Sequence, residues 1–181
     1  MLRRLVLATT ILAIPAALLL DRRLAARRDG RPPEPMRMLV VIDAPPEATW
    51  RVIADIPLQP EWMHEMKSVR LETPGPVRVG TRGEATVRIA GISVTDPVEV
   101  VAFDPPTRFA IRHEGLFSGG GIITCEPGAD GTTTIVRWEE SLVPPLLPHL
   151  GALLQAPILT SIFAADLRRL KALVETGSTD G

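Results

Sequence analysis

Two side chains of this sequence could work together as an acid and a base, His113 and Glu140. Both fall in segments that alternate apolar and polar residues, which predicts β-strands whose successive side chains point to opposite faces. By this alternation His113 shares the inward face with Ile111, and Glu140 shares it with Trp138. An imidazole and a carboxylate beside a bound molecule could transfer a proton to or from it. Their separation does not follow from the sequence, so they are candidates only, and His113 could instead make a structural hydrogen bond or contact a ligand.

The remaining reactive residues favour no other chemistry. Cys125 is the single cysteine, which excludes an internal disulfide and a cysteine zinc knuckle. The three histidines lack the spacing of metal ligands, and we expect neither a metal nor another cofactor. Glu139 adjoins Glu140 in one strand, so these carboxylates point to opposite faces. The chain has no tyrosine and no Gly-x-Ser-x-Gly motif, and a binding role is therefore preferred to catalysis.

Charge and length narrow the class of protein. The 181 residues suffice for one domain with its own core. Residues 1–37 hold eight arginines and three carboxylates, whereas the rest of the chain is acidic. Nucleic-acid binding relies on clustered lysines and arginines, and in the acidic part these are scattered among carboxylates. We therefore expect no nucleic-acid partner.

The basic N-terminal part contains an apolar run from Leu5 to Leu20 with arginines on both sides. A spanning helix needs about 20 apolar residues, and flanking arginines can extend a shorter one. We predict a single-pass membrane anchor over residues 1–28 and a stiff proline-rich tether over residues 29–37. A cleaved signal peptide is the main alternative, although bulky leucines before Asp21 make a poor cleavage site, and a surface helix is another. More arginines follow the run than precede it, which favours a cytoplasmic body.

Elements of the body follow from periodicity and turn residues. A strand over residues 38–44 precedes two short helical pieces, residues 45–56 and 57–66, each entered at a proline. Six further strands are predicted over residues 67–73, 80–91, 92–104, 107–115, 120–128 and 132–142. Apolar residues then recur every three or four positions through residues 144–175, which predicts a long helix that Pro157 should kink or split near Leu154. A sheet with one apolar face needs a cover, and this helix is long enough to provide it.

This order of elements, together with VVIDAPPEATWRVIADI, the PEWM tryptophan, VEVVAFDPPTRFAIR, EPGADGTT and DLRRLKALVE, resembles the SRPBCC superfamily. These are the START and birch-pollen-allergen-like helix-grip domains, and the similarity is greatest to polyketide cyclase/dehydrase-like or coenzyme Q-binding START-like members. It covers residues 38–177, with a flexible tail over residues 178–181. The resemblance implies an α+β fold in which a curved, seven-stranded antiparallel sheet grips the C-terminal helix around a hydrophobic cavity. The two short helices would close one end of the sheet.

Strand alternation predicts which side chains line that cavity. The candidate ligand-binding residues are Trp62, Met66, Val87, Ile89, Val98, Val100, Phe109, Ile111, His113, Ile123, Trp138, Glu140, Leu159, Phe163 and Leu167. Trp62 could equally be ordinary core, and small side chains could let the sheet and helix pack without a void. Ala102 is also predicted to face inward, and Gly119, Gly120 and Gly121 to form a loop or bulge at the cavity mouth.

A mostly apolar wall with a few polar groups suits an apolar ligand that has one polar head. We therefore predict a membrane-anchored binding protein for a lipid, quinone or polyketide-like molecule. A cyclase or dehydratase that uses the same cavity is the alternative, and a scaffold that docks a protein partner is a third possibility. The apolar segment from Leu142 to Leu159 would rest on the membrane or form a lid.

Overall fold

The computed structural model describes the chain over residues 2–89 and 91–177, with side chains from residue 13 onward. The predicted tail, residues 178–181, lies outside this range, as do the side chains of the first half of the Leu5–Leu20 run. Seven strands form one antiparallel sheet in the order β1-β7-β6-β5-β4-β3-β2. The strands are β1 (Met36–Ile42), β2 (Met66–Leu71), β3 (Arg82–Ile89), β4 (Ile92–Asp104), β5 (Arg108–His113), β6 (Ser118–Pro127) and β7 (Thr134–Val143).

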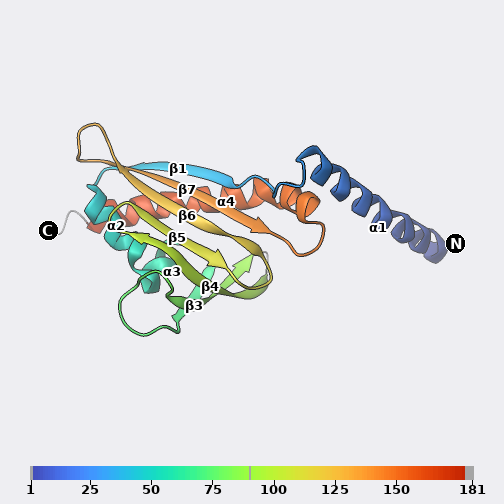
Figure 1. Ribbon diagram of the computed structural model, residues 1–181, viewed down its shortest axis with the longest axis horizontal. Coiled ribbons are helices and arrows are strands. Elements are labelled where there is room, and N and C mark those ends of the chain that lie inside the picture. Colours follow the sequence, from blue (N-terminus) through green and yellow to red (C-terminus); the bar gives the residue numbers. More distant parts are fainter. Residues whose placement is uncertain (1, 90, 178–181) are drawn as a thin grey trace.

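One long helix covers the sheet, as predicted. Helix α4 (Pro148–Gly177) runs along the strands in Figure 1, and Leu159, Leu167, Leu170 and Val174 are buried between it and the sheet. The other helices are α1 (Leu2–Arg27), α2 (Pro46–Ala54), the single turn η1 (Ile56–Leu58) and α3 (Gln59–Trp62). The expected split of α4 at Pro157 does not occur. Pro157 lies in the more exposed half of the helix, where water can replace the hydrogen bond that proline cannot donate.

The segment after β1 differs in part from the prediction. Helix α2 is present, but the second helical piece is only η1 and one turn of α3, because Pro57 and Pro60 limit it to short turns. Met66 belongs to β2, where it pairs with Val87, and not to the end of a helix. The first strand also begins two residues earlier than predicted, at Met36, which pairs with Glu140.

An irregularity in β4 changes which residues face inward. Val100 pairs with Ile111 and Ala102 with Ala110, so the register shifts between Val100 and Ala102. Such a bulge reverses the alternation beyond it. Phe103 therefore points inward, with its ring centroid 6.2 Å from that of Phe109 and 5.6 Å from that of Trp50. The prediction that Ala102 faces inward was wrong for this reason.

The two ends of the sheet are built differently. One end of the sheet carries the β3–β4 hairpin, the β5–β6 connection (residues 114–117) and the β7–α4 connection (residues 144–147), and we call it the near end. Helix α1 and the tether join the body there, and α1 projects away from it (Figure 1). At the far end lie α2, α3 and the last turns of α4 (Figure 1).

Length and hydropathy limit which helices could cross a membrane. Among the described residues, α4 is the one helix that could cross a membrane by these criteria, and 22% of its apolar window is buried. This differs from the expected span at residues 5–20. Helix α4 covers the sheet, and the apolar side chains of its second half pack in the hydrophobic core.

Candidate functional site

A cavity of about 460 Å³ lies between the sheet and α4. Most of its wall is aliphatic or aromatic, contributed by β2 to β7, by the η1–α3 segment and by α4. The lining residues used below are Met66, Asp96, Val98, His113, Gly121, Trp138, Glu140, Leu142, Gln155, Ile158 and Phe163. The small side chains of the sheet therefore do not pack directly on the helix, and the alternative of a filled interior is not what the fold produces.

Nearly all the residues predicted for this wall are on it. Met66, Val87, Ile89, Val98, Val100, Phe109, Ile111, His113, Ile123, Trp138, Glu140, Leu159 and Phe163 line the cavity. Trp62 and Leu167 do not. Trp62 is fully buried at the far end, with its ring centroid 6.1 Å from that of Trp138, and Leu167 is packed in the core. Both side chains therefore belong to the packed core. Trp62, at the end of α3, helps to close the far end of the domain.

Four polar side chains of the wall form a connected chain. His113 Nδ1 lies 2.7 Å from Asp96 Oδ2, and His113 Nε2 lies 3.0 Å from Glu140 Oε1. Trp138 Nε1 donates to the other Glu140 oxygen over 2.9 Å. Asp96 and Glu140 are both buried. The predicted inward pair is therefore in contact, and a second carboxylate completes it.

The charge of this group follows from its contacts. Burial lowers the pKa of the His113 imidazole, but the hydrogen bonds and negative charges of Glu140 and Asp96 outweigh burial, so the pKa is raised overall. A protonated His113 donates to one carboxylate through each ring nitrogen. Neither nitrogen is then free to exchange a proton with a bound molecule. His113 therefore bridges two buried carboxylates, one through each ring nitrogen.

Two glycines make room for these carboxylates. A Cβ on Gly121 would overlap the Glu140 carboxylate, and a Cβ on Gly115 would overlap Asp96 Oδ1. Gly119, Gly120 and Gly121 lie within β6 and do not form the predicted loop at the mouth. Gly121 is needed because its strand passes directly beneath a neighbouring side chain.

Sequence reasoning missed two buried carboxylates on the wall. Asp96 has the same parity as Val98 and Val100 in β4, so extending the alternation by two positions before Val98 would have found it. Asp166 in α4 is buried although it is charged, and its carboxylate accepts from His64 N at 3.1 Å and from Arg169 Nη1 at 2.7 Å. Burial raises the pKa of Asp166. Asp166 lies three residues after Phe163, so the two side chains share one face of α4, and this spacing could have predicted that Asp166 faces inward.

Other candidate chemistry is absent from the described part of the chain. Burial raises the pKa of the Cys125 thiol to about 12, which keeps it protonated and unreactive. His64 is exposed. No group of three His, Cys, Asp or Glu side chains within residues 2–89 and 91–177 could hold a metal ion.

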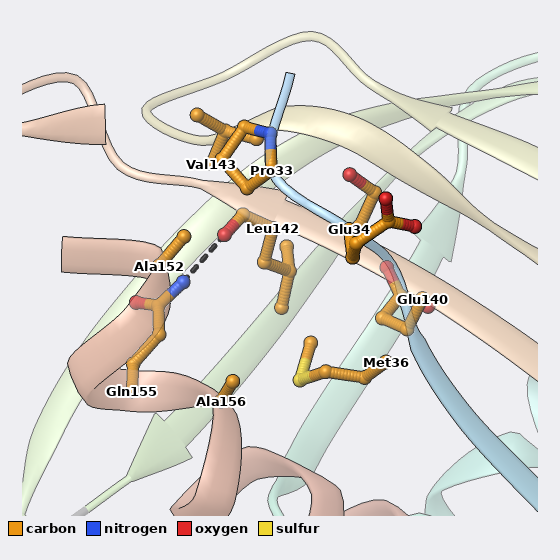
Figure 2. Close-up of a pocket in the computed structure, with 10 residues that line it drawn as sticks. Pro33, Glu34, Met36, Glu140, Leu142, Val143, Ala152, Gln155 and Ala156 are labelled. Atoms are coloured by element: carbon orange, nitrogen blue, oxygen red, sulfur yellow. Dashed lines mark hydrogen bonds between the residues drawn. The ribbon is translucent and has the colours of Figure 1, made fainter. Parts of the chain in front are cut away.

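The cavity opens toward the near end. Ile92 in the β3–β4 hairpin and Ile158 in α4 line it and are 70% and 62% exposed, whereas the lining residues Val100, Phe109 and Ile123 are buried. On the same wall, Gln155 Nε2 donates to the carbonyl oxygen of Leu142 (Figure 2). Figure 2 shows this bond beside a small hollow of about 10 Å³ under the tether, with room for about one water. The near half of α4 is thus tied to β7 where it borders the cavity.

Comparisons with known proteins identify the family of this fold. The family model described as "Polyketide cyclase / dehydrase and lipid transport" matches residues 36–175. The crystal structure of DR_A0006 from Deinococcus radiodurans is similar with a TM-score of 0.60 and 25% identity, over 78% of this chain and 96% of that one. TTHA0849 from Thermus thermophilus is similar with a TM-score of 0.65 and 22% identity, over 80% of this chain and 99% of that one. No curated protein matches.

Proposed function

We propose, from the premise that this chain belongs to the polyketide cyclase/dehydrase and lipid transport family, that it binds a hydrophobic small molecule and holds it at a membrane. The observation that carries the proposal is the open interior. A volume of about 460 Å³ is within the range of roughly 300–1,000 Å³ that small-molecule sites occupy. An apolar interior of this size exposes the wall to water unless an apolar molecule fills it.

The polar network indicates which head group the ligand carries. With His113 protonated, the group contains two carboxylates and one cation, so its net charge is negative. A ligand carboxylate placed beside it would be repelled in a site of low dielectric constant. We therefore expect a neutral head, such as a hydroxyl or a carbonyl, in preference to a fatty-acid anion.

Membrane anchoring is the second part of the proposal. Residues 5–20 are apolar with arginines on both sides, and Ile14, Leu18, Leu19 and Leu20 are exposed on α1. Exposed leucines on an isolated helix are accounted for if lipid surrounds them. A binding protein held at the bilayer stays close to a ligand that partitions there.

Native mass spectrometry of the full-length protein, released from detergent, tests ligand binding. We expect an apolar molecule to co-purify or to bind on addition. Val98→Trp fills the cavity and should abolish the bound mass, whereas Val101→Trp, on the exposed face of the same strand, should retain it. A protein that carries nothing in any of the three forms would overturn the proposal.

A matched pair of ligands tests the head group. Dodecanol and dodecanoate share one chain and differ in charge, and we expect the full-length protein to prefer the alcohol in competition. Glu140→Gln removes one negative charge and should reduce the preference. Equal binding of the two ligands by the unmodified protein would contradict the assigned head group without affecting ligand binding itself.

A cyclase or dehydratase is the second candidate, because the His113–Glu140 pair lies on the cavity wall. An enzyme of this kind needs a proton donor or acceptor that touches its substrate. Both nitrogens of His113 contact carboxylates, which favours binding without chemistry. Turnover of a polyketide-like substrate that His113→Ala abolishes, with affinity unchanged, would reverse this order.

A further inference from the structure

We propose that the near end of the domain docks directly on the bilayer, so that the cavity mouth opens into lipid and not into water. This inference rests on the proposed function and adds the surface through which the ligand passes. Six exposed apolar side chains form what we call the apolar rim: Ile92, Leu116, Leu146, Leu153, Leu154 and Ile158. They come from the β3–β4 hairpin, the β5–β6 connection, the β7–α4 connection and the first turns of α4.

Strand register places these segments together. Ser118 pairs with Val143, so the β5–β6 and β7–α4 connections lie side by side at one end of the sheet. His113 pairs with Val98, and the six residues of β4 that precede Val98 extend beyond it in the same direction toward Ile92. The rim is therefore one surface at the near end, although its residues are far apart in the sequence.

The rim surrounds the cavity mouth. Ile92 and Ile158 belong both to the rim and to the cavity wall, and Leu154 lies one turn before Ile158 on α4. Leu154 is 67% exposed and Leu146 is 81% exposed, which water disfavours for side chains of this size. Covering the rim with lipid buries these side chains and joins the apolar interior to the acyl chains.

A fixed contact with α1 orients the rim toward the membrane. The Asp21 carboxylate near the end of α1 accepts hydrogen bonds from the backbone N–H groups of His149 and Leu150, both over 2.8 Å. These donors belong to the first turn of α4, where a carboxylate is favoured by the unpaired N–H groups and the helix dipole. His149 Nε2 also lies 3.1 Å from the carbonyl oxygen of Arg31 in the tether. The start of α4 lies beside the end of α1 (Figure 1), so the rim is held near the point at which α1 would enter the bilayer.

Charge at the same place suits an anionic lipid surface. Arg22, Arg23, Arg27 and Arg31 are exposed around the end of α1 and the start of the tether. Juxtamembrane arginines attract anionic head groups by about 1 kcal/mol each. Apolar side chains surrounded by such cations match an interface with head groups outside and acyl chains inside better than they match a protein surface.

Site-specific fluorescence of the full-length protein tests the docking. Cys125 is buried with its thiol protonated, so an introduced cysteine can be labelled selectively with an environment-sensitive dye. Leu116→Cys and Leu154→Cys report on the rim, and Val79→Cys, 60% exposed in the β2–β3 connection at the far end, is the matched control. Leu19→Cys reports on insertion of α1. The protein is reconstituted in vesicles of phosphatidylcholine and phosphatidylglycerol, with and without spin-labelled lipid.

We expect blue-shifted emission and quenching by spin-labelled lipid at positions 19, 116 and 154, and neither at position 79. Adding Leu154→Glu and Ile158→Glu should remove the quenching at position 116 while position 19 stays quenched. Quenching at position 19 alone would overturn the docking and leave the anchor in place. If a protein partner covers the rim instead of lipid, the labels at positions 116 and 154 would stay unquenched in these vesicles, and the docking proposal would be overturned in the same way. Ligand detected by native mass spectrometry in that case would show that the proposed function survives without this inference.

Discussion

The far end of the domain is closed by its own side chains, whereas the near end leaves comparable side chains uncovered. Trp62, Ile53 and Ile56 are buried where α2 and the short helices meet the sheet, and Leu170 is buried opposite them on α4. At the near end of the same helix, Leu153, Leu154 and Ile158 are exposed. Apolar composition is similar in the two halves of α4, so the difference lies in what each half has to pack against. Stability should therefore depend on the far end, and ligand exchange on the near end.

The largest expected effect is at the far end. Trp62→Ala should lower the free energy of unfolding by about 3–5 kcal/mol, because the site is fully buried and cannot collapse around the lost ring. Urea denaturation measures this, with the exposed Val79→Ala as the control, which should change it by less than about 0.5 kcal/mol. A decrease in the free energy of unfolding below about 1 kcal/mol would mean that Trp62 is not packed as described.

A smaller but still large effect is expected from His113, toward the near end of the sheet. His113→Gln removes the imidazole that bridges two buried carboxylates, and breaking a buried pair of this kind costs about 3 kcal/mol or more. The double variant His113→Gln with Glu140→Gln should recover part of the loss, because one buried charge is gone. If the double variant loses as much free energy of unfolding as the two single variants together, the result would count against a network between His113 and Glu140.

The pH dependence of stability should come next in size. The pKa of His113 is raised in the folded protein, so its stabilising contribution is complete below its unfolded pKa of about 6.5 and is lost as pH rises through the folded value. We expect the unfolding temperature of the unmodified protein to fall as pH increases above about 6.5, relative to His113→Gln. If the unfolding temperatures of the two proteins change with pH in the same way, the pH dependence comes from groups other than His113.

The smallest effect is expected at the rim. Leu154→Ser should change the free energy of unfolding by less than about 0.5 kcal/mol, since the side chain is exposed and loses few contacts. Denaturation of the full-length protein in detergent, beside Leu170→Ala as the buried counterpart on the same helix, makes the comparison direct. A loss at position 154 that equals the loss at position 170 would remove the distinction between the two ends.

Most of the wall could be predicted from local pattern. Alternation in β3, β5 and β7 placed Val87, Phe109 and Trp138 correctly because a strand repeats every two residues. It failed in β4 beyond Val100, where a bulge that no residue type announces shifts the register. Local pattern also did not reveal that Asp166 in α4 is buried, since charge predicts exposure unless partners such as Arg169 and the backbone of His64 are known.

The sequence by itself determined the order of elements, the inward face of most strands and the long amphipathic helix, because these depend on periodicities within a single segment. Only the tertiary structure decided that Asp96 and Glu140 meet at His113, that Asp21 reaches the first turn of α4, and that the interior stays open. Each of these depends on segments distant in the chain whose separation is set by strand register and sheet curvature. Local spacing contains no information about that distance.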